Sequence, residues 1–137
     1  MKIWVDDMRK APEGFVHVKS VNEAVLLVDA ILTLQEDNLA GFETVFANLN
    51  GMRDDDNKLC KEDFARLQIE VIDLDHDAGD FALCGGDYIK IIDWICLQAS
   101  MGRCQVAMFP LRFHTMNPVG KQNMQRIAEK QGFPVLN

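Results

Sequence analysis

The chain has 137 residues, of which 48% are hydrophobic and 26% are charged, and its formal net charge is −7 at pH 7. A chain of this length and composition is expected to form a single domain, residues 1–137, with a sizeable core, and is not expected to be disordered. The negative charge excludes binding along an extended DNA backbone, so a phosphate ligand must be met by a local group of donors or by a metal ion.

No stretch of the sequence is apolar for long enough to span a bilayer, and no signal-peptide pattern opens the chain. The four cysteines form neither a C-x-x-C pair nor a zinc-finger spacing with histidine. We therefore expect a cytoplasmic protein without membrane contact, in which the cysteines are reduced thiols. The sequence leaves the oligomeric state open.

Two short apolar runs predict the first strands, residues 2–5 and residues 15–19, with the second at the edge of a sheet. Ser20 and Glu23 then form a capping-box pattern, in which the serine side chain binds one free backbone N–H at a helix start and the glutamate binds another. Apolar residues follow at helical spacing to residue 32, so a helix with one apolar face is expected there.

The segment of residues 33–68 is less regular, and we expect it to be an inserted helical and loop segment. Its apolar spacing predicts a helix over about residues 39–49, which Asn50-Gly51 would end as a C-terminal glycine stop. A short helix is also expected over residues 59–67. This segment precedes the predicted central strand of the sheet.

That central strand is predicted in the stretch of residues 71–77, which begins as an apolar run and ends in carboxylates. A helix starting near Asp87 follows, and residues 110–113 predict a further strand. Asn117-Pro118 is a strong helix-start signal, since asparagine is a good N-cap and proline fits the first helical turn. A short final strand is expected at residues 133–136. Alternating strands and helices of this kind predict an α/β fold with a mostly parallel sheet of about four to five strands.

Three predicted strands end in polar clusters: Asp6-Asp7, Asp75-His76-Asp77 and His114-Thr115. Ligands of parallel α/β sheets bind at the carboxyl ends of the strands, where these clusters should meet. Asp6, Asp7 and Asp75 offer the hard oxygen ligands that Mg²⁺ or Mn²⁺ prefers.

The other polar residues at these strand ends suit proton transfer and phosphate binding. His76 and His114 titrate near neutrality and could act as general acid and base, or bind a phosphate. Arg9 is a candidate phosphate partner, and the helix starting after Asn117 would direct its free N–H groups at an anion.

Structural interpretations of the same residues remain open. Asp6-Asp7 could cap a turn, and His76 and His114 could each be hydrogen-bonded structural histidines. Asp73 lies within the predicted strand and is interpreted as structural, and Arg112 could be solvated on the sheet surface.

These motifs resemble a known family. Asp6-Asp7 after a first strand and Asp75 after a central strand are similar to the response-regulator receiver fold, whose acids bind Mg²⁺ and accept a phosphoryl group. More closely, residues 5–14, residues 74–77 and residues 114–120 with Asn123-Met124 resemble the cyclic-phosphate-processing receiver-like family, a group common in phages and bacteria.

The resemblance implies a flavodoxin-like three-layer sandwich and a metal-dependent phosphoesterase activity on a cyclic phosphate, either a nucleotide or a 2′,3′-cyclic RNA end. It places Thr115 at the receiver's hydroxyl position and adds His76, Asp77, His114 and Asn117, with Gly120 in the last motif. The expected partner is a small phosphorylated ligand or an RNA end, in the host cytoplasm if the chain is phage-encoded.

The chain departs from true receivers in one respect, because the lysine expected after the last strand is absent from Phe133–Asn137. A phosphorelay switch is therefore not expected. The alternative to an enzyme is a degenerate receiver that binds a nucleotide or a protein without chemistry, and the sequence does not decide between the two.

Overall fold

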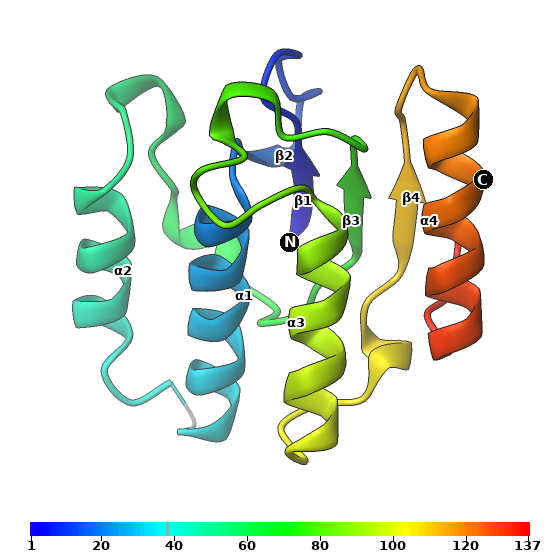
Figure 1. Cartoon of the computed structure of the whole chain (residues 1–137). Helices are drawn as coiled ribbons and strands as arrows, with labels where there is room; N and C mark the ends of the chain where they lie inside the picture. The colour runs from blue at the N-terminus through cyan, green and yellow to red at the C-terminus, as the bar shows by residue number, and fades with distance from the viewer. Residues whose placement is uncertain (38) are drawn as a thin grey trace.

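The computed structural model describes residues 1–37 and 39–137, and this part of the chain forms a four-stranded, all-parallel sheet with four α-helices (Figure 1). The strands are β1 (Lys2–Val5), β2 (Phe15–Val18), β3 (Val71–Leu74) and β4 (Leu111–Phe113), in the order β2-β1-β3-β4. The fold is α/β and consistent with the predicted flavodoxin-like three-layer architecture. The predicted edge position of β2 is confirmed.

The helices are α1 (Val21–Glu36), α2 (Phe42–Gly51), α3 (Ile89–Ser100) and α4 (Pro118–Gln131). In the view of Figure 1, α1 and α3 lie in front of the sheet, α2 lies outside α1, and α4 lies beside β4. None of these helices, in the part of the chain described, is long and apolar enough to cross a membrane.

Local side-chain chemistry sets the ends of two helices as predicted. The Ser20 side chain accepts the N–H of Glu23 at 3.1 Å, and the Glu23 carboxylate in turn accepts the N–H of Lys19 at 3.0 Å. At the start of α4, the Asn117 side chain accepts the N–H of Gly120 at 3.0 Å. These caps satisfy backbone donors that a helix start leaves free, so the two boundaries are fixed by nearby residues alone.

The two faces of the sheet differ in chemistry. One face is wholly apolar and packs in a single core with residues of α1, α3 and α4; its side chains are Ile3, Val5, Val16, Val18, Ile72, Leu74, Leu111 and Phe113. On the other face the strand register aligns Trp4 with His17 and Asp73, and Asp73 with Arg112. The second face therefore carries polar side chains in the middle of the sheet.

The inserted segment differs in detail from the prediction. A single 3-10 turn, Lys61–Phe64, stands where a short helix was predicted over residues 59–67, and another 3-10 turn, Asp55–Asn57, precedes it. Gly51 lies inside the last turn of α2 and does not follow it as a stop. The Asn50 side chain explains both differences, because it accepts the N–H of Leu59 at 2.7 Å and donates to its carbonyl at 3.0 Å, which holds this stretch in an irregular path.

The predicted last strand is reduced to one bridge between Leu111 and Val135. Backbone hydrogen bonds from Leu111 to Pro134 and from Leu136 to Leu111 flank this bridge. Pro134 lacks an N–H group and interrupts the donors that a longer pairing would need.

Candidate functional site

The carboxyl ends of β1, β3 and β4 meet at one edge of the sheet, at the top in Figure 1. The register places Val5, Leu74 and Phe113, the last residues of the three strands, side by side. The pairing continues past the strand ends, because Asp75 donates its N–H to Val5 at 2.9 Å and His114 donates to Leu74 at 3.0 Å. The predicted convergence of the three polar clusters is therefore present in the structure.

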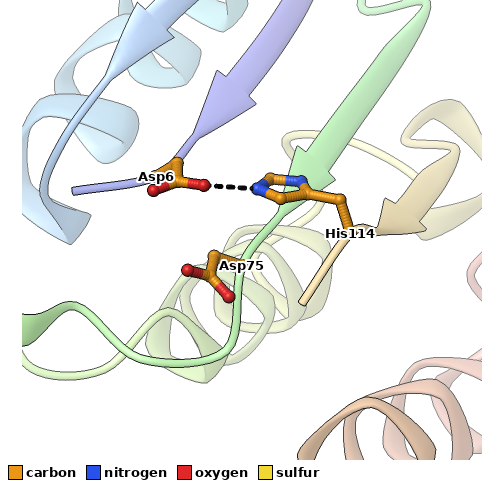
Figure 2. A group of neighbouring side chains, drawn as sticks. All are labelled: Asp6, Asp75 and His114. Carbon is orange, nitrogen blue, oxygen red and sulfur yellow. Dashed lines mark hydrogen bonds and ion pairs between the residues drawn. The ribbon is translucent and has the colours of Figure 1, made fainter. Parts of the chain in front are cut away.

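Three side chains of these clusters form a compact group, shown in Figure 2. One ligand atom each from Asp6, Asp75 and His114 lies within 4.8 Å of the other two. Asp6 and His114 face each other directly, and Asp75 lies beside them (Figure 2). Carboxylates and an imidazole at this spacing can share a cation or a proton.

His114 is held between two buried carboxylates. Its Nε2 lies 2.8 Å from Asp6 Oδ2 and its Nδ1 lies 2.8 Å from Asp73 Oδ1, and the histidine side chain is only 11% exposed. Both ring nitrogens face carboxylate oxygens, so an N–H on either nitrogen can donate to the acid beside it. The ring nitrogens of His114 are therefore both used in hydrogen bonds within the protein.

Packing fixes the same ring from its flat side. The ring of Trp4 stacks on His114 with centroids 3.7 Å apart and an angle of 7° between the planes. The Trp4 Nε1–H donates to the carbonyl of Arg9 at 3.2 Å, and Arg9 Nη1 donates to the carbonyl of His114 at 3.1 Å. The loop after β1 is thus tied to the end of β4.

Asp6 is fully buried, and both of its oxygens are occupied. Oδ1 accepts the backbone N–H groups of Met8 and Arg9, each at 2.8 Å, and Oδ2 accepts from His114. Burial alone would raise the pKa of Asp6, but these amides and His114 together hold that pKa below its ordinary value. Asp6 is a charge compensated within the protein.

The pKa of Asp7, unlike that of Asp6, is raised above its ordinary value. Burial raises the pKa of Asp7, and the negative charges of Asp6, Asp75 and Asp77 raise it further. The chain after β3 approaches Asp7 closely at Gly79, where φ is +54° and an added Cβ would lie 2.1 Å from Asp7 Oδ2. Asp7 is thus a carboxylate whose charge is unfavourable without a positive partner.

Asp75 and Asp77 use part of their oxygen atoms in local turns. Asp75 Oδ1 accepts the N–H of His76 at 2.7 Å, and Asp77 Oδ1 accepts the N–H of Gly79 at 2.8 Å. Each keeps its second oxygen out of these bonds, and Asp75 is partly and Asp77 largely exposed. Asp75 thus keeps an oxygen atom for a ligand, whereas Asp6 and His114 already bind each other.

The ring of His76 packs on the first turn of α4. An added Cβ at Gly120 would lie 2.6 Å from the His76 ring, so only glycine allows this contact. Among the described residues, the His76 ring has no hydrogen-bond partner, which leaves its nitrogen atoms available to a ligand.

Thr115 and Asn117 build the start of α4. Thr115 Oγ1 accepts the N–H of Asn117 at 3.1 Å, and Asn117 accepts that of Gly120. The predicted phosphate-binding residues Asn117 and Gly120 are therefore present as a helix start beside a histidine. Their role toward a phosphate stays a prediction.

Sequence reasoning did not include Asp73 or Trp4 in the site. Asp73 is 1% exposed and accepts from Arg112 Nε at 2.6 Å as well as from His114, so its structural interpretation holds but it also fixes a site residue. Arg112 is accordingly paired rather than simply solvated. The sequence feature that could have placed Asp73 in the site is the alternation of side chains along strands, which puts Asp73 on the same sheet face as Trp4.

His17 and Tyr88 support the site from outside it. The Nε2–H of His17 donates to the carbonyl of Asp6 at 2.8 Å, and the hydroxyl of the buried Tyr88 donates to the carbonyl of Lys19 at 2.7 Å. The predicted core position of Tyr88 is confirmed. Burial, followed by the charges of Asp7 and Asp6, raises the pKa of Tyr88, so its hydroxyl stays a donor.

Comparisons with protein-family models, with curated proteins and with solved structures found no match to this chain. The class that the structure defines is thus an α/β protein with a parallel sheet and a carboxylate–histidine cluster at its carboxyl edge.

Proposed function

We propose that this protein is a metal-dependent phosphoesterase that opens a cyclic phosphate, of a nucleotide or of an RNA 2′,3′ end. One observation carries the proposal: the ends of β1 and β3 bring Asp7 and Asp75 to the edge where His76 lies on the first turn of α4. Acids for a cation, a histidine with free ring nitrogens and a helix N-terminus are groups that can promote phosphate-ester hydrolysis. The resemblance of the motifs adds the cyclic substrate.

Mg²⁺ or Mn²⁺ fits the donor set, since Asp7 and Asp75 offer oxygen atoms and the pKa of Asp7 is raised by neighbouring negative charges. When bound, the ion would neutralise charge on the phosphoryl oxygens. The mixed group of Asp6, Asp75 and His114 fits less well, because a cation there would have to displace the proton between His114 and Asp6.

Opening the ring by hydrolysis adds water across one P–O bond. The water oxygen joins the phosphorus, one sugar oxygen leaves, one proton is taken from the water and one is delivered to the leaving oxygen. In our proposal His76 delivers the proton and Asp77, the exposed neighbouring carboxylate, accepts the other. These two residues are the proposed catalytic pair.

We assign His114 a positioning role. Both of its N–H groups bind buried carboxylates, so it has no proton at hand for the leaving oxygen. It keeps Asp6 ionised and fixes the loop that carries Asp7. Loss of His114 should therefore lower activity through misplacement of that loop and should also lower stability.

The decisive experiment is incubation of the purified protein with Mg²⁺ or Mn²⁺ and a panel of 2′,3′-cyclic and 3′,5′-cyclic nucleotides and cyclic-ended RNA oligonucleotides. Turnover that His76→Gln lowers by about 10²-fold or more, the usual contribution of a general acid, supports the proposal. Asp93→Asn, on the exposed side of α3, is the matched control and should keep full activity. A folded protein that turns over no member of the panel contradicts the proposal.

A binding protein without chemistry is the second candidate, and one observation favours it. Asp6 is neutralised by His114 and by backbone amides, so this buried charge needs no metal ion. Tight binding of a nucleotide that persists in His76→Ala and His114→Ala, with no product formed, would support this second function.

A further inference from the structure

A second polar cavity lies between the edge strand β2 and the inserted segment. Its volume is about 350 Å³, within the range of small-molecule sites, and its lining includes Lys10, Arg53 and Lys58. Three cations in one cavity are unusual for a chain with a net charge of −7. This cavity is separate from the carboxylate cluster, although His17, which also lines it, donates a hydrogen bond to the Asp6 backbone.

Arg53 is fixed by neutral partners. Its Nε donates to the carbonyl of Asn57 at 2.6 Å and its Nη2 donates to the carbonyl of His17. Among the described residues, no carboxylate lies within ion-pair distance of Arg53. The guanidinium is therefore oriented by backbone carbonyls, without a direct ion pair to a carboxylate.

The remaining nitrogen of Arg53 is exposed to solvent, and Arg53 lines the cavity. Nη1 has no hydrogen-bond partner among the described residues, and no buried side-chain nitrogen or oxygen among them lacks a partner. Nη1 must therefore be accessible to solvent. Burial lowers the pKa of Arg53, and the charges of Glu23, Asp63 and Asp54 oppose this effect.

The two lysines add to this positive charge. Lys58 Nζ donates to the carbonyls of Asn50 and Arg53 at 2.5 and 2.6 Å, which uses two of its three protons. Lys10 has no hydrogen-bond or ion-pair partner among the residues described. Asp56 and Asp63 also line the cavity, so its charged side chains are three cations against two carboxylates.

We propose that this cavity binds the phosphate group of a small phosphorylated molecule, with Arg53 and Lys10 as its contacts. Phosphate matches the cavity because a guanidinium with its donors in a fixed plane binds phosphate oxygens strongly. The proposal does not depend on the phosphoesterase function, since no metal ion and no residue of the carboxylate cluster takes part.

An apolar cavity accounts for the rest of the ligand. It has a volume of about 200 Å³ and is lined by Leu26, Leu49 and Met52, and Arg53 lines both cavities. In our proposal the apolar or flat part of the ligand lies there, because the two cavities share Arg53 and Leu59 in their linings. A nucleoside monophosphate has both parts and is the class of ligand that we assign.

The test is a titration of the full chain with inorganic phosphate and with adenosine 5′-monophosphate, followed by NMR and calorimetry in the presence of EDTA. Lys10→Gln removes one cavity charge without breaking an internal contact, and Arg53→Lys keeps the charge but removes the planar donors. Lys130→Gln, an exposed charge at the far end of α4, is the matched control.

We expect the nucleotide to bind more tightly than phosphate alone, and Lys10→Gln to weaken binding of both by 3-fold or more. Arg53→Lys should weaken it further, and Lys130→Gln should change it less than 2-fold. Absence of phosphate binding up to about 10 mM, ten times a millimolar dissociation constant, would overturn the proposal. Equal effects of Lys10→Gln and Lys130→Gln would also overturn it, and equal affinity for the two probes would remove the role of the apolar cavity.

Discussion

The contact between His114 and Asp73 predicts that loss of the Asp73 carboxylate lowers the free energy of unfolding. Asp73→Asn keeps the size of the side chain but replaces one acceptor oxygen with an NH₂ group. The two oxygens of Asp73 face Arg112 Nε and His114 Nδ1, and an asparagine keeps only one of these oxygens. The variant therefore removes the negative charge that faces Arg112 and His114, at a position where residue 73 is 1% exposed.

The size of the effect follows from these contacts. A hydrogen bond to a charged group contributes about 1.5–3 kcal/mol, and breaking a buried ion pair costs about 3–5 kcal/mol. We expect Asp73→Asn to lower the free energy of unfolding by about 3 kcal/mol. With a urea m-value of about 1.5 kcal/mol/M, the unfolding midpoint would fall by about 2 M.

Urea unfolding followed by circular dichroism measures this shift. Asp93→Asn, the same chemical change on the exposed face of α3, should alter stability by less than about 0.5 kcal/mol. Arg112→Gln should cost less than Asp73→Asn, about 1 kcal/mol, because the Arg112 side chain is 39% exposed. A loss below about 1 kcal/mol for Asp73→Asn would refute the view that Asp73 and His114 form a buried ion pair.

Three further predictions follow from the same edge of the sheet. Asp7→Asn removes a charge that burial and like charges make unfavourable, so it should raise the unfolding free energy at pH 7 without metal by up to about 1 kcal/mol. It should also abolish the rise in melting temperature that Mg²⁺ or Mn²⁺ gives the wild type, and an undiminished rise would exclude Asp7 as a ligand. Gly120→Ala places a methyl group against the His76 ring and should cost about 1–3 kcal/mol, whereas Gly51→Ala, with nothing within 4 Å, should not destabilise the protein. Ionised Asp6 stabilises the fold above its unfolded pKa of 3.8, and this contribution is lost as pH falls through its lower native pKa. Asp6→Asn should therefore make the free energy of unfolding depend less on pH below about pH 4. An unchanged acid transition would contradict this reasoning.

Features of the fold that depend on neighbouring residues could be predicted from the sequence. The starts of α1 and α4 follow from Ser20 and Asn117, whose side chains bind backbone N–H groups three residues on. The strands follow from short apolar runs, and their parallel arrangement follows from the alternation with helices. The meeting of three polar strand ends then needed no further information, because parallel strands end at the same edge.

Pairings between distant residues could not be predicted in the same way. His114 binds Asp6 and Asp73, which lie 108 and 41 residues earlier in the chain, and no local pattern selects these partners. Strand alternation could have placed Asp73 on the site face, but its burial depends on Trp4 and on the loop that follows β1. The roles assigned to His76 and Asp77 stay predictions until activity is measured.

The irregular path of the insertion likewise depends on distant contacts. Asn50 binds the backbone of Leu59, and Phe64 packs edge-on against Phe42 and Phe46 of α2. An asparagine before a glycine is typical of a helix stop, yet here the Asn50 side chain binds the backbone of Leu59, nine residues later. Side-chain contacts to later segments therefore overrode the local signal for a stop and for a helix.

The acids at the strand ends divide into two kinds, and this division bears on function. Asp6 is neutralised inside the protein by His114 and two backbone amides, so its charge organises the loop after β1. Asp7, Asp75 and Asp77 have no ion-pair partner in the part of the chain that the structure describes, and the charges of Asp6, Asp75 and Asp77 raise the pKa of Asp7. The divalent cation of the proposed function would lie among these acids, next to the first turn of α4, where the proposed phosphate ligand would reach it.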